Sequence, residues 1–418
     1  MTLTVRPAAV QGTLQAPGSK SATHRALLLA AQSSEPCTVR GPLLAADTAA
    51  TLSCLQAMGA RVAPFEPGGA VRFEPATLRP PPAALDCRNA GTALRLLTAT
   101  AARLGAAVTL AGDESLCARP NGPLLAALRA LGVRAESRDG CAPLRVQGPL
   151  RSGAVRLPSG CSSQFASALL LALPFVPGDS ALTLEAPVAS RPYVDVTLAV
   201  AREAGLRIEA DGDTFRVPGG QAVAARHLAV EGDWSSAAFP LCAAAITGGA
   251  VRVAGLDPNS PQGDRAIVDL LRAFGAEVRP HADGVACTGG PLTSPGTIDV
   301  AATPDLFPIL AVVAAASRGT TTFTGGAGLR AKESDRIAAM AEGLARMGIA
   351  VHERPDGLVV VGGRLRAATL ASWGDHRIHM ALAVAGLAAD GPTTVDGKAS
   401  AAVSYPGFHA DLARLEAA

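Results

Sequence analysis

The sequence predicts an α/β protein of two domains, each built from three copies of one supersecondary unit. Two observations carry this prediction. Short polar clusters that lead into helices rich in alanine and leucine recur every 70 to 72 residues. Helices that end at a glycine before a strand recur at nearly the same interval. Fixed self-similarity of this length indicates a repeated structural unit.

The first repeated feature is the polar start of an apolar helix. It occurs six times, at Lys20, Gly91, Ser162, Asp233, Asp305 and Asp375. The helices that follow carry so few charges that we expect them to be buried on nearly all sides. Six such helices are too many for one core, so three in each of two domains is the natural division.

The second repeated feature is a glycine that closes an amphipathic helix. It occurs five times, at Gly59, Gly132, Gly205, Gly275 and Gly348. Glycine in this place is the usual left-handed helix cap. Short strands such as residues 38–40 and 320–323 complete each unit. Helices inside and sheets outside would satisfy both features.

The domain boundary is expected between the third and fourth units, near Glu231 and Gly232. The first strand lies upstream of Lys20 and could complete the other domain. One domain would therefore span residues 19–231, and the other residues 1–18 with 232–418. Two chain crossings, near residues 18 and 232, predict a hinge.

Composition restricts the class of protein. Apolar residues make up 49% of the chain and charged residues 17%, as in a well-buried globular protein. A net charge of +2 gives no general attraction to nucleic acid or to an anionic membrane. With no charged and apolar leader, we expect a soluble, cytoplasmic protein. Eight scattered cysteines and an isolated HxxH at His376 and His379 predict neither disulfides nor a metal or other cofactor.

The helix starts differ in chemistry. The first three carry cationic, amide or hydroxyl groups, as in Lys20-Ser21 with Arg25, and the last three carry aspartates. A helix N-terminus presents unpaired N–H groups and the positive end of the helix dipole, so it suits an anion. Asp305 is then available as a general base.

Further basic residues fit the same interpretation. Arginine forks match carboxylate and phosphate, so the set suits small substrates with several anionic groups. These residues are Arg119, Arg191, Arg330, Lys332, Arg336 and Arg377. Only three of the 37 basic residues are lysines, namely Lys20, Lys332 and Lys398. Because an ammonium can lose its proton and a guanidinium cannot, each lysine is a candidate for a special role.

These motifs together resemble the 5-enolpyruvylshikimate-3-phosphate synthase family over essentially the whole chain. The resemblance implies a two-lobe fold in which each lobe holds three βαβαββ units. It is carried, in collinear order, by Pro17-Gly18-Ser19-Lys20-Ser21, Asn89-Ala90-Gly91-Thr92, Arg119-Pro120, Ser162-Ser163-Gln164, Ser190-Arg191-Pro192-Tyr193, Pro304-Asp305, residues 330–336 and Gly374-Asp375-His376-Arg377.

The resemblance also implies the substrates. The enzyme would transfer the enolpyruvyl group of phosphoenolpyruvate to the 5-hydroxyl of shikimate 3-phosphate, as a monomer in chorismate and aromatic amino acid biosynthesis. Shikimate 3-phosphate would be held, mainly in the first domain, by Lys20, Ser21, Arg25, Ser162, Ser163, Gln164, Ser190, Asp305 and Lys332. Phosphoenolpyruvate would be held by Lys20, Gly91, Arg119, Gln164, Arg336, Arg377 and Lys398.

The implied catalytic residues are Asp305, Glu333 and Lys20. Asp305 would take the proton from the 5-hydroxyl as that oxygen attacks C2 of the enolpyruvate. Glu333, with Lys20 or Lys332, would give a proton to C3, and the tetrahedral adduct would collapse with loss of phosphate. Base and acid must act together because a secondary hydroxyl is a poor nucleophile and an enol ether a poor electrophile.

Two positions depart from the family pattern. Gly328 stands where many members carry asparagine, so one contact to shikimate 3-phosphate is lost or replaced. Lys398 lies one residue further from the following proline, Pro406, than the pattern expects.

Three alternatives stay open on the sequence alone. The related UDP-N-acetylglucosamine enolpyruvyl transferase shares the fold but carries asparagine after its first lysine, where this chain has Ser21. A non-catalytic scaffold that binds polyanions would explain the repeats, but not the difference between an aspartate at one helix start and a lysine at another. Glu333 could also be an exposed carboxylate that only stabilises a helix start.

Overall fold

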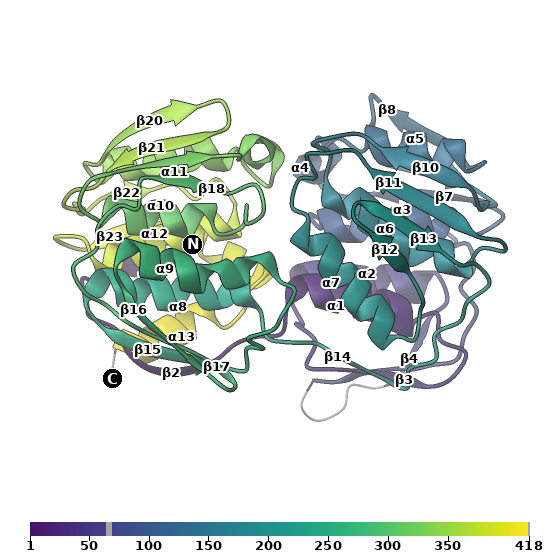
Figure 1. The fold of residues 1–418 in the computed structure, drawn as a ribbon, viewed down its shortest axis with the longest axis horizontal. Coiled ribbons are helices and arrows are strands. Elements are labelled where there is room, and N and C mark those ends of the chain that lie inside the picture. Colours follow the sequence, from purple (N-terminus) through teal and green to yellow (C-terminus); the bar gives the residue numbers. More distant parts are fainter. Residues whose placement is uncertain (64–68, 417–418) are drawn as a thin grey trace. The chain divides into compact units, whose positions relative to one another are not determined.

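The computed structural model describes residues 1–63 and 69–416. The chain divides into two compact units (Figure 1). Unit 1 comprises Met1–Pro17 and Glu231–Ala418, and unit 2 comprises Gly18–Val230. Each unit encloses its own cluster of buried apolar side chains.

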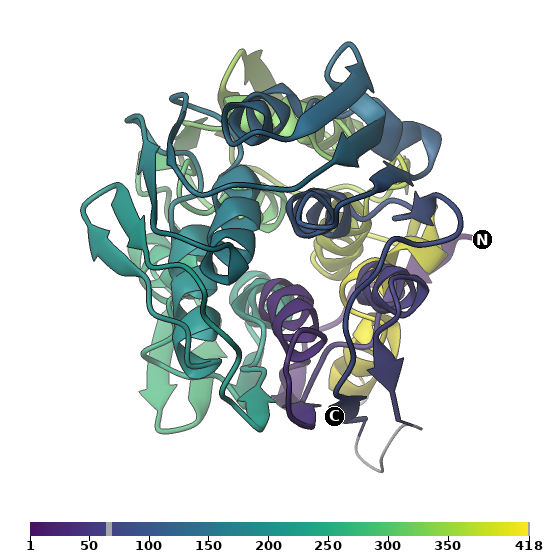
Figure 2. The same cartoon turned by 90° about the vertical axis from the view of Figure 1, so that its right-hand side faces the viewer.

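Three helices form the centre of unit 2. They are α1 (Lys20–Ala30), α3 (Gly91–Ala101) and α6 (Ser163–Ala172). α3 packs on both α1 and α6, and nearly all the side chains of the three helices are buried. The other helices of the unit are α2 (Ala46–Ala57), α4 (Glu114–Cys117), α5 (Gly122–Ala130), α7 (Pro192–Glu203) and the 3-10 helix η1 (Leu173–Phe175). Figure 2 shows these helices surrounded by the strands of the unit.

Three sheets with one strand order cover the helices of unit 2. The first two strands of each sheet are parallel and the other pairs antiparallel, as repeated βαβαββ units require. In spatial order the sheets are β14 (His227–Ala229), β3 (Cys37–Arg40), β5 (Val71–Glu74), β4 (Arg61–Val62); β6 (Leu85–Asp86), β7 (Ala107–Ala111), β9 (Cys141–Gln147), β8 (Arg134–Arg138); and β10 (Ala154–Leu157), β11 (Ser180–Leu184), β13 (Thr214–Val217), β12 (Glu209–Asp211).

Unit 1 repeats this plan in its central helices and in two of its three sheets, and its third sheet has three strands. Its central helices are α8 (Trp234–Thr247), α10 (Phe307–Ala315) and α12 (His376–Leu387), each of which packs on the other two. The remaining helices are η2 (Gly263–Ala266), α9 (Ile267–Phe274), η3 (Ala327–Ala331), α11 (Arg336–Arg346), η4 (Lys398–Val403) and α13 (Phe408–Glu416). Its sheets are β2 (Gln11–Gln15), β15 (Ala250–Ala254), β17 (Gly284–Thr288), β16 (Glu277–His281); β18 (Thr297–Asp299), β19 (Thr320–Thr324), β21 (Gly357–Val361), β20 (Ala350–Arg354); and β1 (Leu3–Val5), β23 (Thr393–Val395), β22 (Thr369–Leu370).

In each unit, one sheet contains the strand that directly precedes, in the sequence, the first central helix of the other unit. β2 precedes α1 in the sequence but pairs in parallel with β15 of unit 1. β14 precedes α8 but pairs in parallel with β3 of unit 2. A glycine lies at each crossing because a side chain would not fit there. A Cβ on Gly18 would lie 2.2 Å from the Gly41 oxygen, and a Cβ on Gly232 would lie 2.1 Å from the Gly255 oxygen.

Both repeated sequence features mark helix ends. The five capping glycines all have positive φ, between 82° and 100°, which confirms the left-handed caps. Four central helices are capped at their start by side chains, those of Ser19, Ser162, Asp233 and Asp375.

Asp305 differs from the expectation. α10 begins at Phe307 after the N-cap Leu306, so Asp305 lies in the preceding turn and does not cap the helix. Its carboxylate is therefore available to other partners. Within the described part of the chain, no helix is both long and apolar enough to cross a bilayer.

Candidate active site

The first helix start of unit 2 holds a lysine in an ion pair. Lys20 Nζ lies 2.9 Å from Asp47 Oδ2, and the two side chains are only 14% and 8% exposed. Asp47 belongs to the first turn of α2. Asp47 was not predicted as a partner of Lys20, and only its place near a helix start could have pointed to it.

Arg25, which is also on α1, is completely buried. Its guanidinium donates to Thr197 Oγ1 at 2.7 Å and to Ser167 Oγ at 2.9 Å, as well as to two backbone carbonyls. All these acceptors are neutral, and burial lowers the pKa of Arg25 to about 10. Arg25 thus ties α1 to α6 and α7 by hydrogen bonds.

The start of α3 is surrounded by cations. A Cβ on Gly91 would lie 3.3 Å from Arg119 Nη1, 3.5 Å from Arg95 Nη1 and 3.8 Å from Gln164 Oε1. Two guanidinium groups therefore stand beside a helix N-terminus at a residue that has no side chain. This is the geometry expected of a small-anion site. Arg95, which lies one helical turn after Gly91, is a cation of this helix start but was not among the substrate ligands that the family resemblance implied.

The neighbouring side chains are fixed by hydrogen bonds. Gln164 joins α6 to α3, because its Nε2 donates to Thr92 Oγ1 at 3.0 Å and its Oε1 accepts from Arg95 at 2.6 Å. Arg119 is 6% exposed and donates to Asn89 Oδ1 at 2.5 Å. The starts of α3 and α6 thus form one connected group.

Three serines of unit 2 lie at helix starts. Ser162 caps α6, where its Oγ accepts from the Gln164 N–H at 3.3 Å, and Ser163 is buried in the first turn. Ser190 precedes α7 with a left-handed backbone, φ 54°. This conformation costs about 1–3 kcal/mol outside glycine and is concentrated at functional sites.

In unit 1, one arginine binds three carboxylates. Arg336 is 1% exposed, and its Nη1, Nη2 and Nε lie 2.8 Å from Asp305, Glu333 and Asp375 respectively. Burial alone would lower the pKa of Arg336. The carboxylates outweigh burial and raise the pKa well above its ordinary value.

A second arginine completes this group. Arg377 is 4% exposed, and its Nη2 lies 3.0 Å from Asp305 Oδ2. We call Arg336, Arg377, Asp305, Glu333 and Asp375 the arginine–carboxylate cluster. Both oxygens of Asp305 accept from an arginine, so in this state neither is poised to take a proton.

Glu333 lies outside any helix. α11 begins at Arg336 and is capped by Asp335, and the Glu333 side chain is 18% exposed. Glu333 is therefore not the exposed carboxylate of the alternative interpretation, and its role in catalysis stays a prediction. Lys332, next to it, is half-buried.

Asp264 is a buried carboxylate that the sequence analysis missed. It is 3% exposed, accepts a hydrogen bond from Ser235 Oγ, and its Oδ1 has no hydrogen-bond partner among the described residues. Burial, and next the charge of Asp305, raise the pKa of Asp264 to about 7, while Arg377 acts in the opposite direction. No local sequence signal distinguishes Asp264, because its role depends on tertiary neighbours.

The two departures from the family pattern are both at the surface. Gly328 is exposed, and a Cβ there would meet nothing within 4 Å, so the missing side chain leaves open space. Lys398 is exposed at the start of η4, where its backbone N–H donates to the Met1 oxygen at 3.2 Å.

The isolated HxxH has other partners. His379 Nε2 lies 2.9 Å from His409 Nε2, and its Nδ1 lies 2.6 Å from the Asp396 oxygen. In the described ranges, no three His, Cys, Asp or Glu side chains gather as metal ligands would.

Comparison with solved structures defines the class of fold. The chain is similar to the enolpyruvyl transferase NikO from Streptomyces tendae, with a TM-score of 0.79 and 21% identity over 99% of this chain and 97% of that one. A structure of EPSP synthase from Acinetobacter baumannii is also similar, with a TM-score of 0.82 and 30% identity over 99% and 98% of the two chains. The predicted enolpyruvyl transferase fold is confirmed.

Comparison of sequences defines the family. Residues 5–412 match the family EPSP synthase (3-phosphoshikimate 1-carboxyvinyltransferase). Relatives called 3-phosphoshikimate 1-carboxyvinyltransferase from Methanothrix thermoacetophila and Methanocorpusculum labreanum are 46% and 42% identical, each over 100% of this chain and 99% of the relative. The chain therefore belongs to the EPSP synthase family, and the resemblance found in the sequence is confirmed.

Proposed function

We propose that the chain transfers the carboxyvinyl group of phosphoenolpyruvate to the 5-hydroxyl of shikimate 3-phosphate and releases phosphate, a step of chorismate and aromatic amino acid biosynthesis. Family membership supports the reaction. The observation that carries the assignment to residues is the arginine–carboxylate cluster, because it joins a candidate base, a candidate acid and two candidate anion ligands within one hydrogen-bonded group.

Residues of unit 2 are proposed to hold mainly shikimate 3-phosphate. The starts of α1 and α6 offer unpaired N–H groups and hydroxyls, which suit a phosphate and a polyhydroxylated ring. The proposed ligands are Lys20, Ser21, Arg25, Ser162, Ser163, Gln164 and Ser190, joined by Asp305 and Lys332 of unit 1. For Arg25 the support is indirect, because most of its N–H groups already donate to acceptors within the protein. One of these acceptors is the backbone oxygen of Ser21, so Arg25 holds Ser21 in position.

Phosphoenolpyruvate is proposed to be held by guanidinium groups. Arg119, beside Gly91, is one of them, and Arg336 and Arg377 are the others. The full set is Lys20, Gly91, Arg119, Gln164, Arg336, Arg377 and Lys398, in which exposed Lys398 is the ligand with least structural support.

The catalytic residues are proposed to exchange partners when substrate binds. An incoming phosphate or carboxylate competes with Asp305 and Glu333 for Arg336 and Arg377, since guanidinium binds any of these oxyanions in the same way. Phosphoenolpyruvate would thereby release Asp305 as the base for the 5-hydroxyl. Glu333 with Lys20 or Lys332 is then proposed to supply the proton to C3, and the lysine ammonium is the group that carries this proton while Glu333 is ionised.

A cytoplasmic, monomeric enzyme completes the proposal. All eight cysteines are free thiols, which is typical of a reducing compartment. Each unit also has its own apolar core. A solution mass of one chain, measured by light scattering after gel filtration, is the expected result.

The test is phosphate release from phosphoenolpyruvate by the purified chain, with and without shikimate 3-phosphate. Release should require shikimate 3-phosphate and fall about 10²- to 10⁴-fold in Asp305→Ala. The matched control is Asp269→Ala, because the Asp269 side chain is 84% exposed and, among the residues that the structure describes, pairs only with Arg272 on its own helix.

Two other outcomes would overturn the proposal. Release that requires UDP-N-acetylglucosamine in place of shikimate 3-phosphate would assign the related transferase. No release with either acceptor, by protein that binds the substrates, would leave the scaffold alternative.

A further inference from the structure

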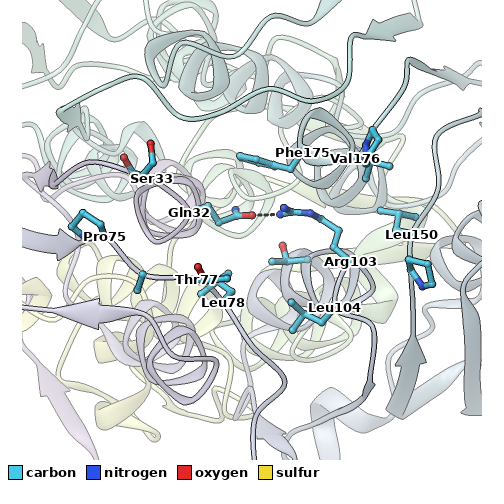
Figure 3. A pocket seen from close by; sticks show the side chains of 15 residues that line it. Gln32, Ser33, Pro75, Thr77, Leu78, Arg103, Leu104, Leu150, Phe175 and Val176 are labelled. Atoms are coloured by element: carbon cyan, nitrogen blue, oxygen red, sulfur yellow. Dashed lines mark hydrogen bonds between the residues drawn. The ribbon is translucent and has the colours of Figure 1, made fainter.

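Unit 2 contains a cavity of about 710 Å³ that none of the proposed substrate ligands lines. It lies where α1, α3 and η1 end, and Figure 3 shows the side chains around it. Lys20 stands at the opposite end of α1, which is roughly 16 Å long by its eleven residues. The cavity is therefore separate from the helix starts that the proposed reaction uses.

Three side chains at corresponding places in the three repeats meet in this cavity. Gln32, Arg103 and Phe175 follow the first, second and third central helices. Arg103 Nη1 donates to Gln32 Oε1, and the Arg103 guanidinium carbon lies 4.5 Å from the centre of the Phe175 ring (Figure 3). The amide and the ring together hold the guanidinium in one orientation.

The charge of Arg103 has no counterion. Within residues 1–63 and 69–416, no carboxylate lies within ion-pair distance of Arg103, and its hydrogen-bond acceptor there is the neutral Gln32. Burial lowers the pKa of Arg103 to about 10. The remaining N–H groups of Arg103 are therefore available as donors.

The rest of the lining is mostly apolar. Leu78, Leu104 and Leu150 form walls around the guanidinium, and the cavity has the volume of a small-molecule site. A guanidinium in such surroundings gains most from a carboxylate or phosphate, which supplies charge and paired acceptors at once. We propose that this cavity binds a small organic anion, with its oxyanion on Arg103 and a cyclic or branched apolar body against the leucine walls.

The test is saturable binding of two probes to the full chain, measured by saturation-transfer NMR and by calorimetry. Benzoate and phenyl phosphate share the apolar ring and differ in the oxyanion, so their relative affinities tell a carboxylate site from a phosphate site. Arg103→Leu should weaken binding of the preferred probe by about tenfold or more. Thr77→Trp, which places an indole from an exposed lining position into the cavity, should do the same without altering the buried charge.

The matched control is Arg216→Leu, on the exposed face of β13. It should leave probe binding unchanged, and all three variants should keep the wild-type KM for phosphoenolpyruvate. Absence of saturable binding of either probe to the wild-type chain overturns the proposal. Equal affinity in wild type and in both cavity variants also overturns it, because the probe would then occupy another site.

Discussion

Replacing Arg336 by lysine tests the central cation of the arginine–carboxylate cluster while keeping its charge. Arg336 reaches three carboxylates through three different nitrogens. A lysine ammonium is a point charge that cannot span the three carboxylates, so we expect it to keep one of them. Two charge-assisted hydrogen bonds are then lost, each of which contributes roughly 1.5–3 kcal/mol.

The exposure of the partners sets the expected cost. Asp305 and Glu333 are 17% and 18% exposed, so water can replace part of what they lose, but Asp375 is completely buried. If the ammonium stays with Asp375, we expect the free energy of unfolding of unit 1 to fall by about 2–4 kcal/mol. Loss of the fork should also raise KM for phosphoenolpyruvate by roughly 10²-fold, equivalent to about 3 kcal/mol.

The protein's own fluorescence gives the assay for stability. Both tryptophans, Trp234 and Trp373, belong to unit 1, so urea unfolding followed by tryptophan emission reports that unit. The matched control is Arg330→Lys, since the Arg330 side chain is 32% exposed and should cost no more than about 1 kcal/mol. An Arg336→Lys variant with the stability of the control and an unchanged KM would refute the reasoning.

Three further predictions concern single sites. Gly91→Ala should raise KM for phosphoenolpyruvate about tenfold, because the new Cβ would lie 3.3 Å from Arg119 Nη1. The free energy of unfolding should not change, since the backbone at Gly91 needs no positive φ. An unchanged KM would contradict this prediction. Asp264→Asn should gain stability relative to wild type as the pH rises from 4 to 7. The folded pKa of Asp264 is raised to about 7, so this carboxyl contributes its full stability below its ordinary pKa and loses that contribution as the pH rises. The same difference between the urea midpoints of the two proteins at pH 5 and at pH 8 would argue against this. Lys20→Met should lower both activity and stability, because it leaves the carboxylate of Asp47 buried without a partner. Adding Asp47→Asn should restore stability but not activity, since it removes that carboxylate. Recovery of activity in the double variant would show that Lys20 only balances the charge of Asp47.

The helix starts and ends were predictable because local chemistry determines them. Ser162 and Asp375 bond to N–H groups two residues ahead, and glycines such as Gly59 adopt the left-handed cap that other residues avoid. Asp305 was expected at the helix start, but it lies one residue before the N-cap. Leu306 takes the cap position in the structure, and the sequence pattern around Pro304 and Pro308 does not distinguish the two starts.

The partners of the site residues were not predictable in the same way. Asp47 matters because α2 packs on α1, which brings its carboxylate to Lys20. Arg95 matters because α3 and α6 pack together and set it against Gln164. Asp264 matters because η2, which follows β15, packs against α8 and buries its carboxylate beside Ser235. Each of these contacts is a property of the assembled unit and has no counterpart in a local stretch of sequence.

The exchange of strands has a consequence for biosynthesis. β2, at residues 11–15, cannot pair until β15, at residues 250–254, has been synthesised. At ribosomal rates, synthesis of the chain between the two strands takes on the order of 10–50 s. Unit 2 is complete once β14 has left the ribosome, so it can fold while β2 is still without its sheet. The waiting segment, Gln11-Gly12-Thr13-Leu14-Gln15, buries only Leu14 in the finished protein. Its polar character lets it remain in water during synthesis without offering the apolar edge from which aggregation begins.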